Sequence, residues 1–203
     1  MNKLFGNVLI VIALLFLPHL SLAQNYEPFL GRFSMAVGIG SSQFDLNEQG
    51  IISDYNSVTN SSTFSDSVTS FNLFLGYQLD EHLAIESELV TAGDVTARDG
   101  GISTKLFDVS TFTVNLALSK SISERTSLYG RIGAHFWDIS ESSGALDTIN
   151  NAVDLTYGLG MDINIYGDRS RQFRLQWNHY EYDEVYINSN DILSANILFQ
   201  IGG

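Results

Sequence analysis

Five charged residues could do chemistry together: Glu86, Glu88, Arg131, Asp162 and Arg174. Glu86 and Glu88 are two residues apart, so in an extended chain both carboxyl groups lie on the same face, as a pair for general acid–base catalysis would. Arginine side chains can instead bridge carboxylates through forked hydrogen bonds. Because buried charges persist only when they are paired, we predict a structural charge cluster and no catalytic residue.

The element that would position Asp162 and Arg174 is a long hairpin predicted over residues 153–179. Every second residue from Val153 to Ile165 is apolar, and polar or small residues stand between them. This period of two is typical of a strand with two chemically different faces. Strands in soluble proteins average about five or six residues, whereas a transmembrane β-strand needs about nine to eleven. The hairpin therefore predicts part of a membrane barrel, with apolar residues outside and polar residues inside.

The same alternation recurs along the chain and predicts an all-β fold, an eight-stranded antiparallel up-and-down transmembrane β-barrel. Long polar links alternate with short turns, which is typical of extracellular loops and tight periplasmic turns. Aromatic residues near both ends of the strands fit two interface girdles. The predicted strands cover residues 29–40, 68–79, 83–92, 106–119, 127–139, 153–165, 173–179 and 191–201.

On these strands the five charged residues face the lumen of the predicted barrel at similar heights above the short turns. An eight-stranded barrel is just wide enough for its side chains to fill. We therefore expect Glu86, Glu88, Arg131, Asp162 and Arg174 to meet in one layer and to close the lumen. A gated ion or proton path through a small pore is the alternative, and planar-bilayer conductance separates the two.

The histidines and the lack of cysteine narrow the remaining chemistry. The chain has no Cys, which excludes thiol and disulfide chemistry, and no two of its four histidines have ligand-like spacing. We therefore predict no metal site and no cofactor. His179 beside Glu181 would fit a lipid-modifying outer-membrane enzyme with lipid-facing Ser, His and Glu. A rim histidine at the headgroup level is the simpler interpretation, so we expect no enzyme activity.

The N-terminus predicts export from the cytoplasm. A basic Lys3, an apolar run over residues 4–17 and the small residues Ser21 and Ala23 predict a signal peptide over residues 1–23, removed after Ala23. One domain over residues 24–203 remains, and no later segment is apolar enough to cross a membrane as a helix. The formal net charge of −13 argues against a nucleic-acid partner, because phosphate backbones are bound by Lys and Arg.

Several short motifs resemble the OmpA-like family of eight-stranded outer-membrane β-barrels. They are LGYQL at 75–79, HLAIE at 82–86, LYGRIGAHFWD at 128–138, LGM at 159–161 and the strand around Arg174. The resemblance implies the outer membrane of a Gram-negative bacterium, contact with outer-membrane lipid and lipopolysaccharide, and insertion by the barrel-assembly machinery. Two features depart from the family pattern: no peptidoglycan-binding domain follows the barrel, and four residues separate the aromatic Phe199 from the C-terminus.

The longest predicted loop, 41–67, holds Asp45, Glu48, Asp54 and Asp66 and no Lys or Arg. We expect a solvated surface segment that contacts an extracellular partner, in a structural or adhesin-like role. The competing interpretation is a soluble periplasmic ligand-binding barrel of lipocalin type. That barrel would reverse the two faces of every strand, so that Arg131 would lie in water and the apolar rows would lie inside.

Overall fold

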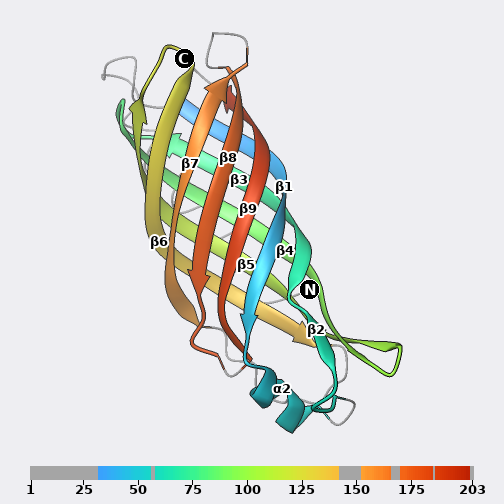
Figure 1. Ribbon diagram of the computed structural model, residues 1–203. Helices are drawn as coiled ribbons and strands as arrows, with labels where there is room; N and C mark the ends of the chain where they lie inside the picture. Colours follow the sequence, from blue (N-terminus) through green and yellow to red (C-terminus); the bar gives the residue numbers. More distant parts are fainter. Residues whose placement is uncertain (1–31, 56–57, 142–151, 166–169, 185, 202–203) are drawn as a thin grey trace.

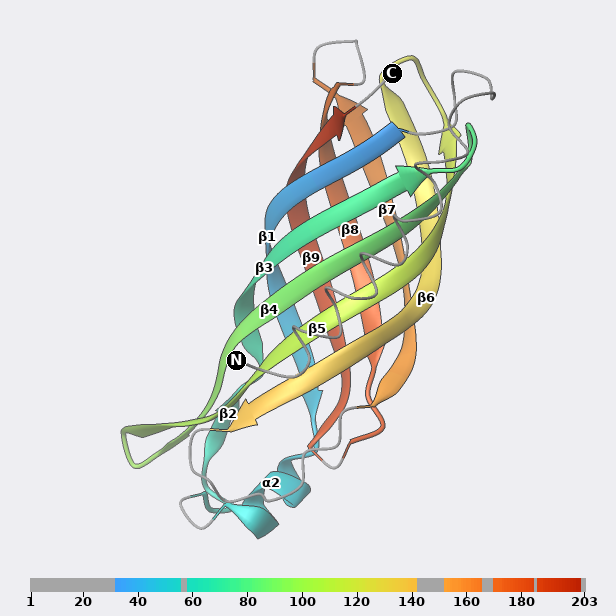
Figure 2. The ribbon, with the colours of Figure 1, turned by 180° about the vertical axis from the view of Figure 1, so that it is seen from behind.

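The computed structural model describes residues 32–55, 58–141, 152–165, 170–184 and 186–201. The predicted signal peptide, residues 1–23, and its cleavage site after Ala23 lie outside the described residues. The strands of the described chain form one antiparallel sheet that closes into a tilted barrel (Figures 1 and 2). Across the described ranges, no helix combines the length and the apolar character needed to cross a membrane.

Eight strands follow one another around the ring in chain order, which confirms the predicted up-and-down topology. The ring closes where β9 returns to pair with β1, from Phe33↔Ile201 to Leu46↔Ile187. A short strand, β2 (Thr63–Ser65), adds to the outer end of β4. The eight ring strands are β1 (Arg32–Leu46), β3 (Ser67–Gln78), β4 (Leu83–Asp99), β5 (Ile102–Ser121), β6 (Thr126–Glu141), β7 (Val153–Asn164), β8 (Arg171–Glu181) and β9 (Ile187–Ile201).

Side chains alternate across the barrel wall as the sequence period predicts. Leu159 and Leu193 are 63% and 64% exposed on the outside, whereas Glu88 and Thr113 are fully buried inside. The exposed apolar residues form the outer band that faces hydrocarbon in a membrane barrel. Because Arg131 is buried and Ile197 is exposed, the lipocalin-type arrangement, which needs the opposite orientation of both, is wrong.

The short turns and the long links lie at opposite ends of the barrel (Figure 1). The turn between β3 and β4 is held by Asp80, whose carboxylate accepts the backbone N–H groups of His82 and Leu83 at 2.7 Å each. These two hydrogen bonds favour the charged form and lower the pKa of Asp80 below its usual value. Arg32 and Ile201 lie at this same end, which is the periplasmic end of an outer-membrane barrel.

The predicted loop 93–105 is wrong, because β4 and β5 continue as a hairpin to its tip. Gly100 and Gly101 form the turn with φ values of 54° and 89°, in the left-handed region that glycine adopts without strain. The pairing shifts register between Ala92 and Thr96. This irregularity breaks the alternation of apolar and polar residues, so the sequence resembles a loop although the strands continue beyond the ring.

The predicted solvated loop 41–67 is also corrected, since part of it folds onto the barrel. β1 continues to Leu46, and the helix α2 (Glu48–Asp54) follows, with the side chain of Asn47 accepting the N–H of Gly50 at 3.3 Å as an N-cap. Ile51 and Tyr55 are 0% and 2% exposed. The many acidic and hydroxyl residues hide this short apolar set in the sequence, although burial of apolar side chains drives the segment onto the barrel.

Gly133 lies on β6 directly against the backbone of β5. A Cβ atom at this position would overlap the carbonyl oxygen of Val114 and lie 2.7 Å from Cα of Asn115, so the two strands would have to separate. We expect Gly133→Ala to lower the free energy of unfolding in lipid vesicles by about 1–3 kcal/mol or to prevent folding. The control is Gly130→Ala on the same strand, whose Cβ meets Leu159 at 3.5 Å. Equal stability of the two variants would contradict this account.

Candidate functional site in the barrel lumen

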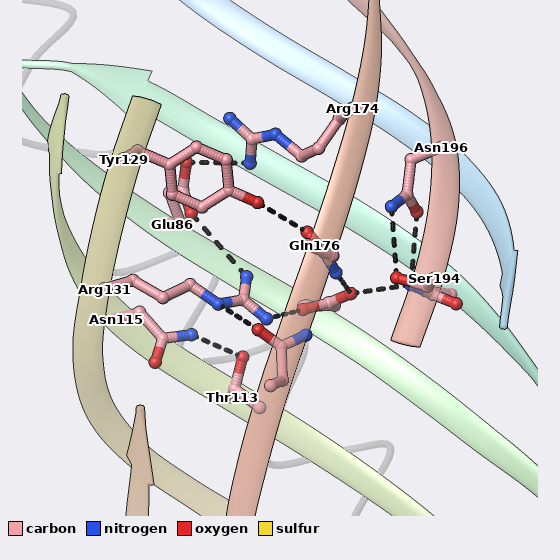
Figure 3. Close-up of polar contacts among 12 residues, drawn as sticks. Glu86, Thr113, Asn115, Tyr129, Arg131, Arg174, Gln176, Ser194 and Asn196 are labelled. Atoms are coloured by element: carbon pink, nitrogen blue, oxygen red, sulfur yellow. Dashed lines mark hydrogen bonds and ion pairs between the residues drawn. The ribbon is translucent and has the colours of Figure 1, made fainter. Parts of the chain in front are cut away.

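The structure places all five predicted charged residues on the inner wall of the barrel, where they meet. Figure 3 shows Glu86, Arg131 and Arg174 among them. Glu86 and Glu88 come from β4, Arg131 from β6, Asp162 from β7 and Arg174 from β8. The four residues other than Asp162 are at most 5% exposed, and the side chain of Asp162 is 12% exposed. We call these five residues the lumen cluster.

The lumen cluster is a continuous chain of ion pairs that crosses the barrel. Arg174 donates from Nε and Nη2 to the two carboxylate oxygens of Asp162 at 2.7 and 2.9 Å, and from Nη1 to Glu86 Oε1 at 3.0 Å. Glu86 Oε2 lies 3.7 Å from Nη1 of Arg131, whose Nη2 donates to Glu88. The two arginines thus link four different strands through charge-assisted hydrogen bonds, which are stronger than neutral ones.

Neutral amides add further hydrogen bonds to the cluster. Glu88 Oε1 accepts from Asn72 Nδ2 at 2.9 Å and from Gln176 Nε2 at 2.7 Å, and Arg131 Nε donates to Asn178 Oδ1 at 2.8 Å. The period of two predicts that these three amides face the lumen, but it does not identify them as partners of the charged residues. Which side chains pair depends on the stagger between strands that are far apart in sequence. The alternation within one strand gives no information about that stagger.

Two aromatic rings also contact the guanidinium group of Arg174. Its Cζ atom lies 4.7 Å from the ring centre of Phe74 and 4.3 Å from that of Tyr129. The hydroxyl of Tyr129 donates to Gln176 Oε1 at 3.1 Å. Cation–π contacts of this kind strengthen when they are shielded from water, so the two rings help to fix Arg174 between Asp162 and Glu86.

A polar pocket lies on the periplasmic side of the cluster. Its wall includes Gln78, Gln172 and Gln200 from three strands, and its inner end includes Asp162 and Arg174. The pocket therefore borders the arginine–carboxylate layer from the periplasmic side.

An apolar plug, which the sequence analysis missed, fills the lumen between the cluster and the extracellular end. The period of two predicts a mainly polar or small inner face with single apolar residues such as Trp137 on it, and it does not predict a continuous apolar layer. Beyond the hydrocarbon region, however, the outside of the barrel meets water, so apolar side chains turn inward as in a soluble protein. The plug consists of Phe44, Ile51, Tyr55, Val58, Val90, Ala92, Val95, Ala97, Leu106, Phe107, Val109, Trp137, Ile139, Tyr180, Tyr182, Tyr186, Ile187 and Ile192.

Polar contacts hold α2 over the plug. The carboxylate of Asp54 accepts the hydroxyl of Tyr186 at 2.6 Å, and the backbone N–H of Asn47 donates to the carbonyl oxygen of Tyr186 at 2.9 Å. The hydrogen bond from Tyr186, followed by one from Ser53, lowers the pKa of Asp54, because both stabilise the carboxylate. The contribution of this contact is present above the ordinary carboxyl pKa and is lost as the pH falls through the lowered value.

The histidines fall into two different environments. His135 is fully buried beside the plug, and its Nε2 lies 2.6 Å from the carbonyl oxygen of Glu181. His179 lies on the outer face with its ring against Tyr157, and its Nδ1 lies 2.9 Å from a carboxylate oxygen of Asp191. Among the residues that the structure describes, no group of three His, Cys, Asp or Glu side chains is arranged to hold a metal ion.

Comparisons with known proteins agree with this architecture. The family model of the outer membrane protein beta-barrel domain matches residues 9–202. No curated protein matches the sequence. Among solved structures, Ail of Yersinia pestis is similar with a TM-score of 0.52 and 19% identity, over 84% of this chain and 99% of that one. Ail has also been crystallised with the heparin analogue sucrose octasulfate.

Two further solved structures show the same fold. OprG of Pseudomonas aeruginosa has a TM-score of 0.51 and 15% identity, over 86% of this chain and 97% of that one. The Neisserial surface protein A has a TM-score of 0.57 and 11% identity, over 84% of this chain and 97% of that one. Since the family model covers nearly the whole sequence, the chain belongs to the outer membrane protein beta-barrel domain family and is a β-barrel of the Gram-negative outer membrane.

Proposed function

We propose that this protein is a closed barrel that acts through its extracellular surface in an adhesin-like role, and that it is neither an enzyme nor an open pore. The observation that carries this proposal is the hairpin of β4 and β5. Within the part of the chain that the structure describes, pairing of β5 with β6 reaches Phe107↔Glu141, whereas β4 and β5 stay paired to Asp99↔Ile102. With β2 added to β4, a small sheet projects beyond the ring (Figure 2).

The contents of the lumen support a closed barrel. The lumen cluster joins strands on opposite sides of the barrel. The apolar plug lies next to it on the extracellular side, between the cluster and α2. An ion entering from the periplasm would have to break the arginine–carboxylate pairs and then cross a layer of buried aromatic and aliphatic side chains, where an isolated charge is strongly disfavoured.

Charge defines the class of partner that the extracellular surface fits. Its described segments carry Asp45, Glu48, Asp99 and many further carboxylates. The cations there are Arg98, which is exposed, and Lys105, which is neutralised by Asp94 at 2.6 Å and Asp108 at 2.9 Å. Such a surface repels polyanions and attracts cations. We therefore do not extend to this chain the sulfated ligand seen with Ail, and we propose a partner with a basic surface.

The hairpin itself supplies the test of adhesion. Ile102 is 73% exposed at the tip, and removal of residues 96–99 and 102–105 would shorten the hairpin while keeping its Gly100–Gly101 turn. We expect bacteria displaying this variant to lose binding to a surface coated with a lysine-rich protein. The deletion removes Arg98 and Lys105 with only one carboxylate, Asp99, so a loss of binding would come from the lost contact surface of the hairpin and not from lost negative charge. Ile102→Ser alone should weaken binding by about tenfold or more if the tip is an interaction hot spot. The control is Glu81→Gln in a periplasmic turn, which should bind like the unchanged protein.

Two results would overturn the proposal. One is adhesion that is unchanged by the shortened hairpin or stronger on heparin than on the basic surface. The other is a steady open-channel current from the purified protein in planar bilayers that changes when Arg131 is replaced, because a closed lumen gives no such current.

A further inference from the structure

The lipid-facing surface has a groove near its periplasmic edge. Leu118 on β5, Gly130 on β6 and Leu159 on β7 are paired in one row across three strands. Glycine in the middle of this row leaves a shallow, open depression between the two leucines, and Leu128 borders it on the periplasmic side. The three leucines are 62%, 63% and 47% exposed, in the order Leu118, Leu159 and Leu128.

A cationic side chain stands at the periplasmic rim of this groove. Lys120 follows Leu118 on the same outward face of β5, pairs with Leu128 and is exposed. Residues two apart on a tilted strand differ in depth by about 5 Å, which lies within the reach of a lysine side chain. No carboxylate among the described residues forms an ion pair with Lys120, in contrast to Lys105 with its two aspartates.

From this juxtaposition we infer that the groove is a binding site for a phospholipid of the periplasmic leaflet. One acyl chain lies over Gly130 between Leu118 and Leu159, and the phosphate contacts the ammonium group of Lys120. The groove is continuous with the exposed apolar band, so its occupant is a lipid and not a water-soluble ligand. Its place next to the turn between β5 and β6 assigns that lipid to the leaflet on the short-turn side.

Gly130 makes the groove testable without damage to the fold. A Cβ added there would meet only Leu159 at 3.5 Å and the carbonyl oxygen of Gly158 at 4.0 Å, which are ordinary contacts. Gly130→Leu therefore fills the groove while the backbone stays in place. Ala134→Leu is the matched control, because Ala134 also faces outward on β6 but lies two rows nearer the extracellular end, between Val114 and Leu155.

The experiment is native mass spectrometry of the folded protein in detergent, titrated with dioleoylphosphatidylglycerol or with dioleoylglycerol, which lacks the phosphate. We expect one retained phosphatidylglycerol, affinity about fivefold lower in Lys120→Gln, loss of retention in Gly130→Leu, and unchanged retention in Lys120→Arg and Ala134→Leu. A heat-dependent gel shift shows that each variant is folded. Retention by Gly130→Leu equal to that of Ala134→Leu, or equal retention of dioleoylglycerol, would overturn the inference.

Discussion

Replacing Arg131 with leucine is expected to lower the free energy of unfolding by about 3–5 kcal/mol, because loss of one member of a buried ion pair leaves its partners charged and unpaired. Arg131 is 4% exposed and contacts both Glu86 and Glu88. After the substitution Glu88 would keep only its amide donors, Asn72 and Gln176, and no cation. Leucine fills part of the volume but cannot replace the charge.

Urea unfolding of the protein in lipid vesicles measures this loss. The matched control is Arg98→Leu on the projecting hairpin, where the arginine is exposed and its removal should change stability by about 0.5 kcal/mol or less. Adding Glu88→Gln to Arg131→Leu should restore part of the loss, because it removes the unpaired carboxylate. A loss no larger than that of the control would show that the lumen cluster does not stabilise the barrel.

The sequence alone predicts the ring and the content of its charged layer. The alternation from Val153 to Ile165 is long, regular and specific to strands, and it tells which residues face the lumen. Because a narrow barrel brings inward residues of equal height together, the meeting of Arg131 and Arg174 with Glu86 follows from counting residues above the short turns.

The extracellular end of the barrel could not be predicted in the same way. A register shift near Val95 reverses which residues face inward, and the shift depends on the pairing with β5, which a single strand does not reveal. Predicting the apolar plug would also require knowing where the membrane ends. Apolar residues face lipid within the membrane, but beyond it they face the inside of the barrel. The helix α2 is short, and its one clear signal is the N-cap Asn47.

The closed lumen and the projecting hairpin are physically connected. Val95 and Ala97 on β4 and Leu106 on β5 belong to the apolar plug, and they sit at the base of the hairpin. The same core that blocks the lumen therefore anchors the sheet that projects from it. In the proposed adhesin-like role, a rigid base allows the hairpin to bind a partner with little loss of conformational entropy.

Trp137→Ala is expected to cost about 3–5 kcal/mol of unfolding free energy, because it leaves a large cavity in the plug. Trp137 is 0% exposed, its ring lies 5.5 Å from that of Tyr182, and its Nε1–H donates to Asp154 Oδ2 at 2.7 Å. The substitution removes the packing and the hydrogen bond together. Loss of order at the base of the hairpin should follow, so adhesion should fall with stability.

The other tryptophan of the chain is a natural control for this prediction. Trp177 lies on the outer face, 5.9 Å from the ring of Tyr157, where lipid can fill the space that a truncated side chain leaves. Trp177→Ala should therefore cost about 1 kcal/mol, the worth of an aromatic pair. The sequence has two Trp, so each single Phe variant keeps one of them and reports its environment. Brominated lipid chains should strongly quench the fluorescence of the Trp137→Phe variant, which keeps Trp177. They should quench the Trp177→Phe variant, which keeps Trp137, only weakly. Equal quenching, or equal losses of stability for the two alanine variants, would mean that the plug is not the packed core from which the hairpin projects.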